Sequence, residues 1–109
     1  MAYGRLAVAD LTATVNNVLY TAPSTVLYTE VDVLVVNSNV ADRSLKLYVT
    51  TSPGSPSTTE RIEDGVVLPA AGGKVELNGL ILSPGESIVI YPSGSDLTAR
   101  VQGKEITKI

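Results

Sequence analysis

The stretch from Leu77 to Gly94 constrains the fold of this chain more than any other part of the sequence. Two short apolar runs, Leu80–Leu82 and Ile88–Tyr91, flank Ser-Pro-Gly-Glu at positions 83–86. Proline pre-sets φ at the first central position of a tight turn, and the glycine after it can adopt the positive φ of a type II turn. The stretch therefore predicts a β-hairpin, which needs further strands to cover it because two strands alone are marginal in water.

The longest alternating pattern lies in Thr25–Asn37, which we expect to be a strand that ends in backbone-bonding Asn37-Ser38-Asn39. Its two faces are expected to divide into an inward set of Leu27, Val31, Val33 and Val35 and an outward set of Tyr28, Glu30 and Asp32. Ser44–Thr51 alternates as well and is expected to return antiparallel to it, with Leu45, Leu47 and Val49 inward.

Turn signals separate the other short runs, which cover residues 18–21, 60–68, 74–77, 97–102 and 104–109. Residues 1–18 are expected to form an N-terminal arm or edge strand, and residues 19–109 a single domain. The sequence therefore predicts an all-β fold of seven to nine short strands, a small antiparallel β-sandwich that is immunoglobulin-like or jelly-roll-like.

Composition excludes much chemistry. The chain has no Cys and no His, so thiolate or imidazole metal sites, disulfides and a Ser-His-Asp triad cannot be assembled. The net charge of −3 with scattered arginines disfavours nucleic-acid binding. No apolar run is long enough for a membrane helix, and the first residues lack a secretory signal, so we expect synthesis in a cytoplasm. We expect no cofactor and no enzymatic activity.

Carboxylates are the only conceivable catalytic or calcium-binding set. Glu30 and Asp32 share one strand face, and Glu60, Glu63 and Asp64 lie around another strand. Charged residues of this kind are mostly solvated surface groups, and the spacing of an EF-hand loop is absent. We therefore expect these carboxylates to be surface residues.

Apolar residues on the outward side of several strands point to assembly. They fall opposite the inward residues of their own strands, so both faces of those strands require cover. The cover could come from the N-terminal arm, from a neighbouring subunit or from a larger assembly, and these alternatives are open at this point. The candidate assembly residues are Leu34, Val36, Ile81, Val89 and Tyr91.

Several segments resemble a group of small virion proteins of tailed bacteriophages that have an immunoglobulin-like or related β-sandwich fold. The similar segments cover most of the chain from Leu19 onward, namely Leu19–Pro23, Val31–Asn37, Ser44–Val49, Leu68-Pro69, Gly79–Ser87 and Leu97–Gly103 with Glu105-Ile106. The sequence departs from the group at Ser24, where a glycine is usual. The resemblance implies a structural role in the virion and carries over no catalytic residue.

The leading expectation is a capsid decoration, or cement, protein that bridges neighbouring capsid subunits in the virion. Its expected partners are the major capsid protein or other virion proteins and further copies of itself, with a trimer favoured. The first alternative is a module of the tail, baseplate or fibre. The second is a carbohydrate- or receptor-binding sandwich in which outward Tyr28 and Tyr48, expected on adjacent strands, stack on a sugar.

Overall fold

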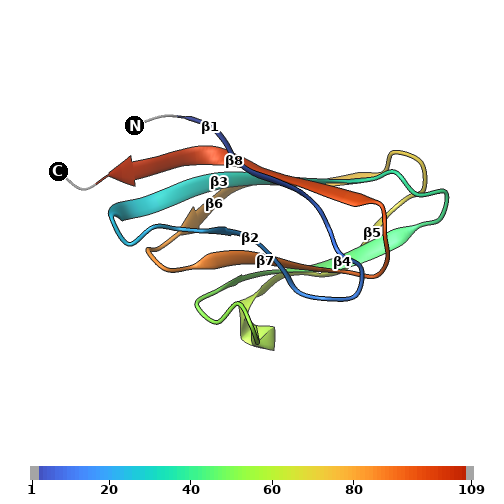
Figure 1. The fold of residues 1–109 in the computed structure, drawn as a ribbon, viewed down its shortest axis with the longest axis horizontal. Coiled ribbons are helices and arrows are strands. Elements are labelled where there is room, and N and C mark those ends of the chain that lie inside the picture. The colour runs from blue at the N-terminus through green and yellow to red at the C-terminus, as the bar shows by residue number, and fades with distance from the viewer. Residues whose placement is uncertain (1–2, 108–109) are drawn as a thin grey trace.

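The protein is a sandwich of two antiparallel four-stranded sheets in a computed structural model, which describes residues 3–107. Figure 1 shows the two layers face to face. Sheet A has the strand order β1-β8-β3-β6 and sheet B the order β2-β7-β4-β5. The strands are β1 (Tyr3–Asp10), β2 (Asn17–Thr21), β3 (Val26–Asn37), β4 (Arg43–Thr50), β5 (Arg61–Leu68), β6 (Lys74–Leu82), β7 (Ser87–Pro92) and β8 (Leu97–Thr107). The predicted all-β sandwich is confirmed.

The strand pairs are nested. β1 pairs with β8, β2 with β7, β3 with β6 and β4 with β5, and successive pairs lie in alternate sheets. This arrangement is the jelly roll, one of the two topologies that the sequence left open. An immunoglobulin sandwich differs, because its first and second strands are neighbours in one sheet.

The core lies between the sheets and consists almost entirely of aliphatic side chains. Inward residues alternate with outward ones along each strand, as the pleat requires. The largest fully buried side chains of the interior cluster are Val31, Val33, Val35, Leu45, Leu47, Leu68, Leu82, Ile88, Ile90, Leu97 and Val101. The predicted inward positions of β3 and β4 are confirmed for most residues, whereas Leu27 is 55% exposed because the register of β3 against β8 shifts between Val26 and Tyr28.

Every edge strand carries an extra residue relative to its partner. The extra residues are Leu6 in β1, Leu19 in β2, Ile62 and Gly65 in β5, and one residue of Asn78-Gly79 in β6. Such bulges twist an edge and interrupt its row of free backbone groups, which discourages the addition of another strand. The sandwich is therefore protected at its edges, and its two outer faces are the surfaces left for association.

The predicted hairpin around Ser83–Glu86 is wrong, although its turn is present. The Glu86 amide donates to the Ser83 carbonyl at 3.0 Å, and Gly85 has φ +88°. However, β6 belongs to sheet A and β7 to sheet B, so the turn is a corner between the sheets. A type II turn has the wrong twist for a tight hairpin and splays the flanking strands.

Three further strand predictions also need correction. β4 does not return beside β3 but lies in the opposite sheet, between β7 and β5. Residues 74–77 and the apolar run after them form the single strand β6, with Asn78-Gly79 at its bulge. Likewise β8 runs unbroken to Thr107, and the predicted end of a separate last strand at Lys108-Ile109 lies outside the described residues.

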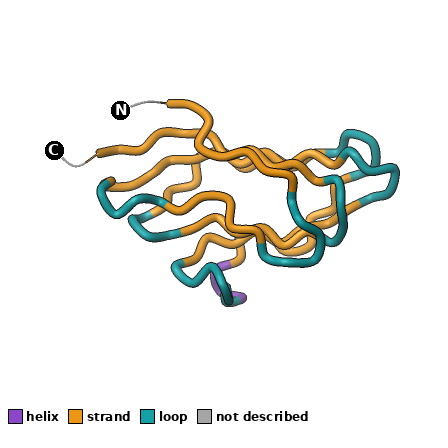
Figure 2. The backbone as a smooth tube through the Cα atoms, in the orientation of Figure 1, coloured by secondary structure: helices purple, strands orange, loops and turns teal. Residues whose placement is uncertain are grey.

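A loop between β4 and β5 contains the only helical turn in the described part of the chain, η1 (Thr58–Glu60). Figure 2 shows this turn on the side of sheet B that faces away from sheet A. The Glu60 carboxylate accepts hydrogen bonds from the Ser57 amide at 2.9 Å and the Thr50 hydroxyl at 2.8 Å. These hydrogen bonds lower the pKa of Glu60 and tie the loop to β4.

Candidate functional site

The structure divides the five predicted assembly residues between two opposite faces. Leu34 and Val36 of β3 lie on the outer face of sheet A, in register with outward residues of β8 and β6. Ile81 of β6 lies on the same face, in register with Glu30 of β3. Val89 and Tyr91 of β7 lie on the outer face of sheet B. These residues therefore belong to two separate surfaces and cannot form one contact site.

Val89 is not an exposed surface residue, contrary to the prediction. It points outward, because its neighbours Ile88 and Ile90 belong to the interior cluster, yet it is fully buried and lies outside that cluster. Its register partners are Val18 in β2 and Tyr48 in β4. A short side chain in a central strand is readily covered by larger cross-strand neighbours on either side, which explains the burial.

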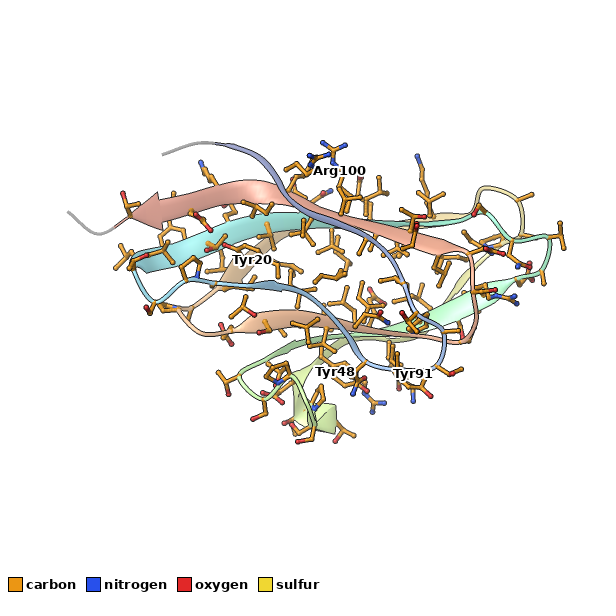
Figure 3. The ribbon with its side chains drawn as sticks, viewed as in Figure 1. Tyr20, Tyr48, Tyr91 and Arg100 are labelled. Carbon is orange, nitrogen blue, oxygen red and sulfur yellow. The ribbon has the colours of Figure 1, made fainter. Side chains whose placement is uncertain are left out.

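The outer face of sheet B carries an apolar patch around Val89. We define the sheet B patch as Val18, Tyr48, Val89 and Tyr91. Val18 is 51% exposed and Tyr91 is 36% exposed, while Tyr48 is half-buried. Figure 3 shows Tyr48 and Tyr91 on the side of sheet B away from sheet A. Tyrosine is enriched in protein interfaces, so two tyrosines beside exposed Val18 make this patch a candidate contact surface.

Charged residues border the sheet B patch on one side only. Lys46 is in register with Tyr91, and Arg61 is in register with Tyr48. Arg61 makes an ion pair with Asp64 at 3.1 Å. An apolar centre with a polar margin is the usual anatomy of a contact surface between proteins. Sequence reasoning missed Val18 and Tyr48 as members of this patch, because their neighbourhood depends on strand pairing.

The outer face of sheet A carries both apolar and charged side chains, and the charges are separated by strand. β1 and β8 contribute the bases Arg5, Arg100 and Lys104 and the acid Asp10, whereas β3 and β6 contribute the acids Glu30, Asp32 and Glu76 and the base Lys74. Figure 3 shows Arg100 pointing away from the sandwich on this side. The face therefore has a basic half and an acidic half that meet between β8 and β3.

The tyrosine pair of the carbohydrate-binding alternative does not exist. Tyr28 lies on β3 in sheet A, and Tyr48 lies on β4 in sheet B. The two rings therefore cannot stack on one sugar. The prediction was wrong because it placed β4 beside β3.

The acidic residues form no compact site. Glu30 and Asp32 lie in sheet A, whereas Glu60, Glu63 and Asp64 lie in or next to β5 of sheet B. Residues 3–107 contain no group of three or more acidic residues placed to hold a metal ion, and no pocket is found among them. Asp32 accepts a hydrogen bond from the Gly79 amide at 2.9 Å, which supports the bulge of β6.

A polar contact joins the two sheets near one end of the sandwich. The Tyr20 hydroxyl of β2 donates to Glu105 Oε2 of β8 at 2.5 Å and lies 3.3 Å from the hydroxyl of Thr29, which is fully buried in β3. Burial, and then the hydrogen bond to Glu105, raise the pKa of Tyr20 from 10.0 to about 12. We interpret the contact as structural, because the hydroxyls of Tyr20 and Thr29 and the Glu105 carboxylate are all in hydrogen-bonding contact with one another through Tyr20.

Replacing Tyr20 with Phe tests this contact. The Glu105 carboxylate loses its donor, so the free energy of unfolding should fall by about 1–2 kcal/mol at neutral pH. Because folding raises the pKa of Tyr20 to about 12, wild-type stability should also decline relative to the variant from about pH 10 upward. Urea unfolding between neutral pH and about pH 11 measures both effects.

Tyr91→Phe is the control, since it removes the same hydroxyl from an exposed side chain. It should change the unfolding free energy by less than about 0.5 kcal/mol. An equal loss of stability in the two variants would contradict a specific role for the Tyr20 contact.

Comparison with known proteins adds no family to these observations. A scan against protein-family models, a search of curated proteins and a search of solved structures each gave no match. No helix in the described range has the length and apolar character needed to span a membrane.

Proposed function

We propose that this chain is a structural protein of a bacteriophage virion, most specifically a capsid decoration protein that bridges neighbouring capsid subunits. The observation that carries the proposal is the sheet B patch, an apolar surface with a charged margin on an otherwise ordinary outer face. Resemblance of the sequence to small phage virion proteins supplies the virion context. The jelly roll supports it as an analogy only, because viral capsid domains use this fold and so do lectins and other proteins.

Protected edges support binding through a face. A decoration protein must add to a shell without forming open-ended strand ladders between its own copies. The bulges of β1, β2, β5 and β6 act against such ladders. Bound to the shell, the sheet B patch would bury Val18, Tyr48 and Tyr91 across the junction of two capsid subunits. This contact would strengthen the shell by holding both subunits at once.

A module of the tail, baseplate or fibre is the alternative location, since the same patch could dock there. Electron microscopy of particles that carry a label fused after Ile109 distinguishes the two. Label distributed over the head is expected. Label confined to the tail would replace the decoration assignment with the alternative, and particles without label would contradict a virion role.

The sheet B patch itself is tested with particles assembled without this protein. Val18→Ser together with Tyr91→Ser should weaken binding of added protein to those particles by about tenfold or more, because both exposed members of the patch are lost. Co-sedimentation measures the binding. Val40→Ser is the matched control, since Val40 is 93% exposed in a loop away from the patch. Equal binding by both variants would exclude this patch as the docking surface.

A further inference from the structure

We propose that a second copy of this chain docks on the outer face of sheet A, around a two-fold axis that runs parallel to the strands between β8 and β3. The pairing deepens the proposed assembly role and rests on it for its purpose. The evidence for it is the separation of charge on this face. The surface is distinct from the sheet B patch, which stays free to contact another protein.

A two-fold axis in this position superimposes complementary strands. It places β8 of one copy over β3 of the other and β1 over β6, while residues at the same level along the strands stay level. Because the interface is isologous, each contact occurs twice. Face-to-face packing with the strands nearly aligned is also the usual way in which two sheets stack.

The central charges match under this operation. Lys104 is in register with Glu30 within one sheet, so the axis between β8 and β3 places Lys104 over the partner's Glu30. Four residues further along each strand, Arg100 and Leu34 are in register, and the axis places the aliphatic stem of Arg100 over the partner's Leu34. Two bases of β8 thus face the acidic half of the partner.

The acid of the basic half and the base of the acidic half also lie opposite each other under this operation. Asp10 is the acid of the basic half, and Lys74 is the base of the acidic half. Both lie at the level of Thr98 and Val36, at opposite edges of the sheet. The two-fold axis exchanges the edges and so brings Asp10 next to the partner's Lys74.

Lys104 and Glu30 take part in no ion pair closer than 4.0 Å within residues 3–107. The ion pair found in that range is Arg61–Asp64 in sheet B. Glu30 and Lys104 are therefore available to a second copy. Opposite potentials across an interface set its register and exclude incorrect partners more than they add affinity.

The face is large enough for a specific contact. Four strands spaced about 4.8 Å apart span about 19 Å, and the level part of the ladder from Tyr28 to Val36 extends about 30 Å, which gives nearly 600 Å² in projection. Two such faces together bury somewhat more than about 1,000 Å², the area above which an interface is expected to be specific rather than a packing contact. Half-buried Leu34 and Val36 supply apolar area toward one end of the face, on the central strand β3.

Analytical ultracentrifugation of the isolated protein tests the proposal. Wild type should form a species of twice the 11.4 kDa chain mass. Its dissociation constant should be about tenfold or more lower in low salt than in about 500 mM salt, because salt screens the opposed charges. Lys104→Glu and Glu30→Lys should each raise the dissociation constant about tenfold or more, because each places two like-charged pairs in the dimer. An equimolar mixture of these two variants should dimerise like wild type, because every opposed pair then joins an acid to a base.

Restoration by mixing separates the interface from any folding defect, since two misfolded variants cannot repair one another. Lys46→Glu makes the same charge change on the outer face of sheet B and should leave the dimer intact. A monomeric or trimeric wild type, unaltered dimerisation of the single variants, or a mixture that stays monomeric would overturn the proposal. A dimer with no place in the virion would instead overturn the proposed function alone.

Discussion

Replacing Gly103 with alanine is expected to lower the free energy of unfolding by about 3 kcal/mol or more. Gly103 lies in β8 at the centre of sheet A, between Gly4 of β1 and Val31 of β3. An added Cβ would lie 1.9 Å from the Glu30 carbonyl oxygen and 2.9 Å from the Val31 Cα. Backbone atoms on a central strand cannot move away without separating β8 from β3.

Gly4→Ala is the control for this prediction. Gly4 is the register partner of Gly103 in the same sheet, but no atom lies within 4 Å of its Cβ position. This variant should be neutral or slightly stabilising, because alanine reduces the entropy of the unfolded chain. Thermal and urea unfolding compare the two. Gly103→Ala melting within a few degrees of Gly4→Ala would show that β8 and β3 can separate at little cost.

Local pattern was sufficient to predict the fold class and most inward positions. Strict alternation identified Val33, Val35, Leu45 and Leu47, which are all buried. Alternation reports which side of a strand is apolar, and this property is carried by neighbouring residues in the chain. The seven to nine turn-separated runs likewise indicated a sandwich before any pairing was known.

Strand partners could not be predicted, because pairing in a jelly roll joins segments far apart in the sequence. Nothing local states that Lys104 will lie beside Glu30, or that Val18 and Tyr48 will flank Val89. The predicted hairpin and the predicted Tyr28–Tyr48 pair failed for this same reason. The separation of charge on sheet A could likewise be recognised only after β8 had been placed beside β3.

Asn37 should be the most sensitive polar residue of the chain. It is fully buried at the end of β3, and its Nδ2 group donates to the carbonyls of Ala41 at 3.0 Å, Leu68 at 3.0 Å and Pro69 at 3.2 Å. Its Oδ1 atom accepts from the Asn39 amide at 2.9 Å. One side chain therefore satisfies backbone groups from two crossings between the sheets.

Asn37→Ala is expected to cost about 2–4 kcal/mol, because it leaves a cavity and buried carbonyl groups without donors. Asn39→Ala is the control. The Asn39 side chain accepts from the Ala41 amide and donates to Asp96 in an exposed part of the same loop. Water can replace these hydrogen bonds, so the unfolding free energy should fall by about 1 kcal/mol or less. Urea unfolding measures both. Similar losses at the two positions would contradict the central role of Asn37.

Asn37→Asp distinguishes the lost donors from the lost volume. Aspartate has nearly the shape of asparagine, but its ionised carboxylate would face the three carbonyl oxygens that Nδ2 now serves. This repulsion and the burial would raise the pKa of the carboxyl group in the folded state. The variant would therefore keep its stability below the unfolded pKa of about 4 and lose it as the pH rises through the higher folded pKa. The stability deficit of Asn37→Asp should therefore grow between about pH 4 and pH 7, whereas that of Asn37→Ala stays constant. A pH-independent deficit in both variants would mean that the volume of Asn37, and not its hydrogen bonding, holds this corner of the sandwich together.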